Sequence, residues 1–173
     1  ISHLSVFGFA PQPLLMCLGT CLTDIPDVDV FQLRREPRGW KWAAAPSSSE
    51  VIVDPPKAAG GLPVLVVGIS GTITIDRIWR VLGKDVNVWT VRVPSPHNDW
   101  LCCRDQLRAL RRAFRQVFDE IKAAHGQATT IHVFPAMPIA GAIEFGRVRM
   151  PKADAPMRIY DQVNDRDGFV PAI

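Results

Sequence analysis

The chain has 173 residues, of which 47% are hydrophobic and 21% are charged, a composition typical of packed globular proteins and unlike that of disordered ones. Its net charge of +3 is too small to indicate binding to duplex DNA, although it suits a small anionic ligand. No segment approaches the roughly 18 consecutive apolar residues of a membrane-spanning helix, and no secretory leader is found.

The first 62 residues predict short elements followed by a linker. Residues 4–9 alternate between apolar and polar side chains and end at a proline-marked turn, which predicts a strand. Because the first residues of the sequence already form this strand, we expect the chain to begin inside a larger polypeptide. Residues 13–19 predict a short buried helix that ends at a glycine, and residues 28–32 predict a second strand. Residues 40–42 form a candidate edge strand, and the Ser-, Pro- and Gly-rich residues 43–62 predict a linker.

The remaining residues alternate between strand and helix patterns. Strands are predicted at residues 63–68, 86–93, 129–134 and 157–160, and helices at residues 75–82, from 98 or 99 to about 124, and at 137–145. Asn98 or Asp99 is expected to cap the long helix, which Gly126 ends. This alternation predicts an α/β fold with a mostly parallel sheet flanked by helices.

Two segments of the chain match one another in order and spacing. Residues 4–11 align without gaps on residues 131–138, and each segment then runs through seven residues to a glycine, Gly19 or Gly146, before a turn and a strand. The match predicts two related α/β halves, at residues 1–42 and 63–173. The alternative is that any two βαβ units look alike, because the same sheet geometry imposes their periodicity.

In an open α/β sheet, ligands bind beyond the carboxyl ends of the strands. Ser70-Gly71-Thr72 lies at such an end, where small residues let the backbone approach a phosphate and hydroxyls add donors; the alternative is an ordinary tight turn. His97 and Asn98 could contact a base edge or a ribose, although Asn98 equally suits a helix cap. The ligand-binding residues that we predict are Gln12, Pro13, Ser70, Gly71, Thr72, His97, Asn98, Ala136, Met137 and Pro138.

Other conspicuous residues suggest structural roles. The four cysteines form no CxxC pair, so we expect no metal site and reduced thiols, which favours an intracellular protein. The long helix carries a stripe of arginines from Arg104 to Arg115, for which neighbouring acidic residues favour a solvated or subunit-facing role over nucleic-acid binding. Trp40 and Trp42 could stack on a base, but core or interface packing is the commoner use of tryptophan. The roles of Arg77 and Arg158 stay open.

The two repeated segments, taken with residues 68–72 and the Arg35…Trp40-Lys41-Trp42 segment, resemble the SAVED family. The most specific string is residues 131–138 followed by Glu144-Phe145-Gly146 and residues 158–161. The resemblance implies two fused CARF-like, Rossmann-like halves that sense cyclic di- or trinucleotides in bacterial antiphage (CBASS) immunity. Members are normally fused to an effector, here an HNH-type endonuclease by preference, and ligand binding controls their oligomerisation.

The sequence departs from the family pattern in two respects. Its first half lacks the opening strand and helix that residues 63–82 give to the second half, and it contains no effector module. We therefore expect an isolated cytoplasmic bacterial sensor domain with no catalytic residue, no cofactor and no direct DNA binding. Two alternatives remain: a ring phosphodiesterase or small Rossmann-like hydrolase, and an assembly module that needs no ligand.

Overall fold

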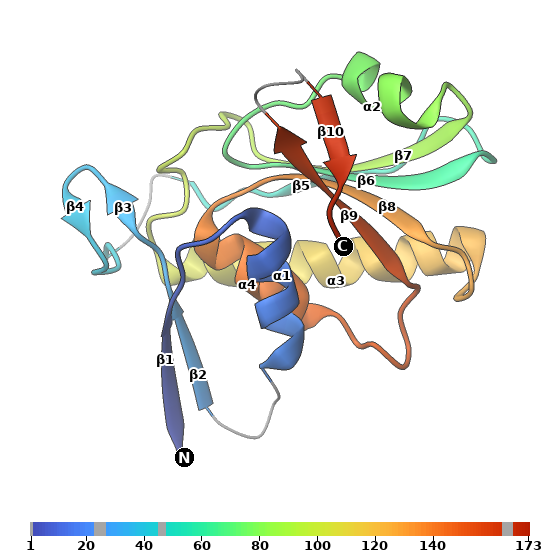
Figure 1. Ribbon diagram of the computed structural model, residues 1–173. Helices are drawn as coiled ribbons and strands as arrows, with labels where there is room; N and C mark the ends of the chain where they lie inside the picture. Colours follow the sequence, from blue (N-terminus) through green and yellow to red (C-terminus); the bar gives the residue numbers. More distant parts are fainter. Residues whose placement is uncertain (1, 23–26, 45–47, 164–167) are drawn as a thin grey trace.

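The computed structural model describes residues 2–22, 27–44, 48–163 and 168–173. Its largest element is a six-stranded sheet in the order β10-β9-β8-β6-β7-β5 (Figure 1). The strands are β5 (Ile52–Asp54), β6 (Leu62–Gly68), β7 (Val86–Arg92), β8 (Ile131–Ala136), β9 (Met157–Val163) and β10 (Gly168–Pro171). The four inner strands are parallel, whereas β5 and β10 are antiparallel to their neighbours. The predicted α/β fold with a mostly parallel sheet is confirmed.

Helices cover both faces of this sheet. On one face α2 (Ile75–Leu82) packs Ile78 against Phe134 and Tyr160. On the other face α3 (Arg104–His125) and α4 (Ile139–Val148) bury Phe114 and Phe145 in the larger core. The central strand β6 is covered on both sides, so residues 63–68 are all buried, which explains why they form one continuous apolar run.

The first repeated segment forms a separate small layer. Strands β1 (His3–Phe7) and β2 (Asp27–Phe31) pair in parallel, and the helix between them, α1 (Gln12–Cys21), lies against α4 (Figure 1). The second repeated segment has the same arrangement, with β8 and β9 in parallel and α4 between them. The shared order of elements and the shared parallel pairing support the duplication that the sequence predicts.

The matched glycines of the two segments meet where α1 and α4 cross. A methyl group added to Gly19 would overlap the carbonyl oxygen of Ile143 and lie 2.9 Å from the Cα of Gly146. Reciprocally, a methyl group added to Gly146 would overlap the carbonyl oxygen of Met16 and lie 2.9 Å from the Cα of Gly19. The spacing that relates Gly19 to Gly146 also relates Met16 to Ile143. The contact is therefore symmetric, and only glycine fits on either side.

Two predictions about the first 62 residues are wrong. Residues 40–42 form no strand; instead a short hairpin, β3 (Arg34–Arg35) and β4 (Arg38–Gly39), precedes them, and Trp40 packs edge-on against Phe7 with ring centroids 5.2 Å apart. Residues 43–62 are not entirely a linker, because β5 pairs with β7 at the edge of the sheet. The boundaries of the two halves stay a prediction.

The predicted start of the long helix is also wrong. Helix α3 begins at Arg104, after Cys103 as its N-cap residue, and the side-chain carbonyl of Gln106 accepts hydrogen bonds from the backbone N–H groups of Cys102 and Cys103 at 2.9 and 3.3 Å. Asp99 instead accepts a hydrogen bond from the backbone N–H of Arg35 at 3.1 Å. The C-terminal strand β10 was not predicted from the sequence.

Candidate functional site

An open cleft of about 570 Å³ lies beyond the carboxyl ends of β1, β6 and β8, where α1 and α4 begin. It is lined by residues 9–12, 32–33 and 137–139, together with Leu15, Arg35, Ser70 and Asn98. The first repeated segment, the second repeated segment and the turn after β6 all contribute to it. This is the position at which open α/β sheets bind ligands.

Five of the ten predicted ligand-binding residues line this cleft. They are Gln12, Ser70, Asn98, Met137 and Pro138. Residues from the turns after β1, β6 and β8 therefore lie around one shared cavity. Whether these residues contact a ligand stays a prediction.

The other five predicted residues lie next to the cleft without lining it. Gly71 and Thr72 follow Ser70, and the exposed His97 precedes Asn98 and donates its backbone N–H to the carbonyl oxygen of Ile69 at 3.1 Å. Pro13 is buried in the first turn of α1. The carbonyl oxygen of Ala136 accepts the backbone N–H groups of both Ile69 and Ser70 at 2.8 Å, so it fixes the turn after β6.

Two glutamine side chains join the halves at the floor of the cleft. The carbonyl oxygen of Gln12 accepts the backbone N–H of Met137 at 3.0 Å, and that of Gln32 accepts the backbone N–H of Ala140 at 2.9 Å. The amide nitrogen of Gln32 donates to the carbonyl oxygen of Leu33 at 2.8 Å, so both ends of this buried side chain are paired. Gln32 was not among the predicted site residues, and the sequence signal for it was a polar side chain at the end of the strand predicted at residues 28–32.

Phe9 and Arg35 are also among the lining residues that were not predicted. Phe9, in the turn between β1 and α1, is 85% exposed. Arg35, in the β3–β4 hairpin, is the one ionisable side chain that lines the cleft among the described residues. The sequence signal for Arg35 was its place in the basic, Trp-containing segment, whereas Phe9 matches a small residue, Ala136, in the second repeat.

The arginine stripe of α3 is largely neutralised within the molecule. Ion pairs join four of its members to carboxylates of the same chain: Arg104 to Asp29, Arg108 to Asp105, Arg111 to Glu144, and Arg115 to Asp119 and Asp154. Three of these arginines, Arg104, Arg111 and Arg115, thus join α3 to carboxylates outside the helix. Arg77 lies over the ring of Phe169 at 4.6 Å, and neither Arg77 nor Arg158 lines the cleft.

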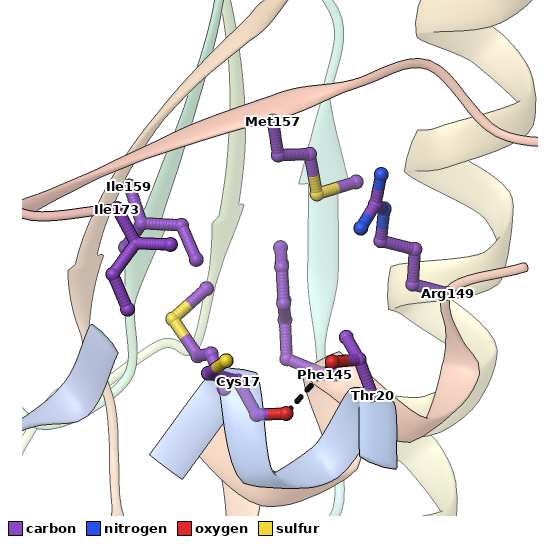
Figure 2. A pocket seen from close by; sticks show the side chains of 9 residues that line it. Cys17, Thr20, Phe145, Arg149, Met157, Ile159 and Ile173 are labelled. Carbon is purple, nitrogen blue, oxygen red and sulfur yellow. Dashed lines mark hydrogen bonds between the residues drawn. The ribbon is translucent and has the colours of Figure 1, made fainter. Parts of the chain in front are cut away.

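Two other cavities differ from the cleft in size or position. A cavity of about 80 Å³ lies between α1, α4 and β9. Its lining is mainly apolar, and Figure 2 shows Cys17, Phe145 and Met157 around it. It is smaller than the ~150 Å³ space that accommodates benzene in a protein core. A wider hollow of about 830 Å³ lies between α2 and residues 54–58, on the far edge of the sheet from both repeated segments.

Two further properties concern metals and membranes. Within residues 2–22, 27–44, 48–163 and 168–173, no three His, Cys, Asp or Glu side chains gather as a metal site would require. Over the same ranges, none of the helices combines the length and the apolar character needed to span a bilayer.

The comparisons with known proteins place the chain in a family and a fold. The family model described as "SAVED: SMODS-associated and fused to various effectors sensor domain" matches residues 2–173. A search of curated proteins finds no match.

Among solved structures, the Acinetobacter baumannii Cap4 SAVED/CARF-domain containing receptor with the cyclic trinucleotide 2'3'3'-cAAA superposes with a TM-score of 0.70 at 12% identity, covering 98% of this chain and 37% of that one. The same receptor with 3'3'3'-cAAA gives 0.66 at 14% identity, covering 99% and 38%. The receptor without a named ligand gives 0.64 at 13% identity, covering 98% and 35%. The chain thus spans little more than a third of the receptors that it resembles.

Proposed function

The chain belongs to the SAVED family of sensor domains, and from this premise we propose that it binds a cyclic oligonucleotide in the cleft between its two repeated segments. The observation that carries the proposal is that one cavity of about 570 Å³ is lined by both repeats at the carboxyl ends of their strands. The cyclic trinucleotides named for the Acinetobacter baumannii receptors make a three-phosphate ring the first ligand to test.

The chemistry of the cleft suits such a ligand. Ser70 supplies a hydroxyl, and Gln12 and Asn98 supply amides, which can bond to phosphate oxygens, sugars or base edges. Leu33 and Met137 offer apolar surface for the faces of the bases. In this proposal Gly71, Thr72 and His97 extend the rim of the cleft, while Pro13, Ala136 and Pro138 fix the shape of its turns.

We propose that the domain senses the ligand and carries out no catalysis. A ring that contacts both repeats is bound more tightly when they close on it, so the ligand shifts the population toward a closed arrangement. In a bacterial CBASS defence protein this change would control cytoplasmic assembly and activate a fused effector, for which an HNH-type endonuclease is the preferred candidate. The paired arginines of α3 support a domain that leaves DNA contacts to its effector.

Isothermal titration with a panel of cyclic di- and trinucleotides tests the proposal. We expect saturable binding of at least one cyclic trinucleotide, weakened by Ser70→Ala and unchanged by Ser49→Ala, a serine that does not line the cleft. Absence of binding across the panel by well-folded protein would reject the sensor function.

Two further measurements separate the alternatives. Chromatography of the ligand after incubation should return it intact, since cleaved products would favour a ring phosphodiesterase. Light scattering should show a ligand-dependent change in mass, whereas a constant oligomer would favour a ligand-independent assembly module.

A further inference from the structure

Phe9 is an aromatic side chain without a packing role. The residue is 85% exposed, and it lines the cleft. The matched position in the second repeat holds the half-buried Ala136, so the turn between strand and helix forms there without an aromatic ring. The fold therefore does not require phenylalanine at this position. An exposed ring in a concave site is instead typical of a surface that a ligand covers.

Arg35 gives the cleft a positive charge. It is exposed, and it is the one ionisable side chain among the described residues that line the cleft. Its backbone N–H donates to the carboxylate of Asp99 at 3.1 Å, which holds the hairpin against the loop before α3. No described carboxylate forms an ion pair with its guanidinium, in contrast to Arg104, Arg108, Arg111 and Arg115 of α3.

We infer that Phe9 and Arg35 form a subsite for one nucleotide of the ring, in which the base stacks on Phe9 and its phosphate pairs with Arg35. This inference rests on the proposed function and adds which side chains hold a nucleotide. Each nucleotide of a cyclic oligonucleotide carries one phosphate charge, and enclosing that charge is costly unless a cation meets it. Arg35 supplies that cation, and Phe9, which lines the same cleft, supplies an aromatic face on which a base can stack.

The subsite belongs to the first half and gives the cleft an unequal composition. The side formed by the turn after β6 and the start of α4 offers Ser70, Met137 and Ile139, which are polar or apolar but uncharged. A ring of identical nucleotides would therefore meet a different set of contacts at each position. Because every base has a π-face on which an aromatic ring can stack, Phe9 is expected to add affinity to ligands that differ in base.

Titration calorimetry with 2'3'3'-cAAA and 3'3'3'-cAAA, at low and at high salt, tests this subsite. Phe9→Leu is expected to weaken binding by about 5- to 100-fold for whichever ring binds, with an unchanged salt dependence, because it removes stacking. Phe9→Trp should retain the wild-type affinity. Arg35→Gln is expected to weaken binding about tenfold and to reduce its salt dependence, because it removes a phosphate contact. Arg35→Lys should retain part of the affinity and part of its salt dependence.

Two control variants are matched to these changes. Leu14→Ala removes an exposed apolar side chain of α1, and Arg38→Gln removes a cation from the same hairpin; neither residue lines the cleft, so both should bind as the wild type does. If the wild type binds and Phe9→Leu and Arg35→Gln stay within twofold of it, the subsite is refuted while the sensor function stands. If the wild type binds no member of the wider panel, the sensor function is refuted, and the subsite with it.

Discussion

The two repeated segments share one local design but differ in how deeply it is buried. In the first, Phe7 stacks on Phe31 with ring centroids 4.6 Å apart, and Trp40 meets Phe7 edge-on. In the second, Phe134, which matches Phe7, stacks on Tyr160 at 4.4 Å, and Phe169 meets Phe134 edge-on. Yet Phe7 is 53% exposed, whereas Phe134 is fully buried.

The difference shows that the sequence pattern determines the local geometry of the aromatic stack. The surroundings determine how much the stack contributes to the free energy of unfolding. The second segment lies in a six-stranded sheet whose faces are covered by helices, and the first lies in a two-stranded sheet held chiefly through α1. Two strands alone are marginal in water. The first segment therefore depends on its contacts with the second, and the variants below test that dependence.

The largest effect is expected where α1 and α4 touch. Gly146→Ala would place a methyl group against the carbonyl oxygen of Met16 and force the helices apart along their whole contact. We expect a loss of at least about 4 kcal/mol in the free energy of unfolding, measured by denaturant titration. Gly39→Ala is the control, because nothing lies within 4 Å of an added methyl group there. Equal stability of the two variants would show that the first segment does not depend on this joint.

The matched aromatic residues Phe134 and Phe7 should differ in their contributions to the free energy of unfolding. Phe134→Ala leaves a cavity in a fully buried site, and we expect it to cost about 3 to 4 kcal/mol. Phe7→Ala removes a half-exposed ring, and we expect a cost of about 1 kcal/mol. Thermal or denaturant unfolding measures both. Similar costs would contradict the view that burial, rather than local stacking, decides the contribution.

Two carboxylates that pair with α3 extend the comparison to pH. Burial alone would raise the pKa of Asp154, but hydrogen bonds from Arg115, at 2.6 Å, and from the backbone N–H of Met150 hold it below its usual value. Because the folded pKa lies below the unfolded value of about 3.9, this stabilisation is present above that pH and is lost as the pH falls through the folded pKa. Asp154→Asn should cost about 3 kcal/mol at neutral pH and reduce the loss of stability in acid.

Asp29 is the counterpart in the first segment. Its hydrogen bond from Arg104 also lowers its pKa, but its side chain is 31% exposed and that of Arg104 is 46% exposed. Solvent screens such a pair, so Asp29→Asn should cost less than about 1 kcal/mol. Unfolding followed between pH 3 and pH 7 compares the two variants, and an acid sensitivity governed by Asp29 would reverse the expected order.

The leading variant of the last pair, at a glutamine that joins the first repeated segment to the second, is expected to cost less than the leading variants of the pairs above. Gln32→Ala leaves the backbone N–H of Ala140 without its acceptor in a buried site, and we expect a cost of about 2 kcal/mol. Gln12 is partly exposed, so water can replace it and Gln12→Ala should cost about 1 kcal/mol or less. Hydrogen exchange at Ala140 and Met137 provides a local readout. Unchanged protection at Ala140 in Gln32→Ala would show that this bond does not hold the joint.

The sequence was sufficient to predict elements whose pattern is local. Residues 63–68 are apolar throughout because β6 is buried on both faces. The repeat predicted two strand–helix–strand units, and in the structure the two strands of each unit pair in parallel. The missed elements depend on distant partners. Strand β5 has three residues and exists through pairing with β7, and β10 exists through pairing with β9, so neither has a clear period of its own.

The same distinction applies to the cleft. Ser70, Asn98 and Met137 were predicted because strand ends converge in any parallel sheet. Arg35 was missed as a cleft residue because a hairpin outside the repeat carries it there, held by Asp99. Asn98 and Asp99 were mistaken for helix caps because the type of a residue does not reveal that Trp100 and Leu101 would be drawn into the core before the helix begins.

The contact between Gly19 and Gly146 also constrains how the cleft can move. Backbones that touch can pivot about the point of contact but cannot slide along one another. Both glycines lie seven residues after the first residue of their helix, so the arms that reach from this pivot to the cleft are about 10 Å long at 1.5 Å per residue. A rotation too small to disturb the glycine pair would thus be enlarged at the opposite ends of the helices. In the closure proposed above, this joint would be the pivot about which the ends of α1 and α4 at the cleft move.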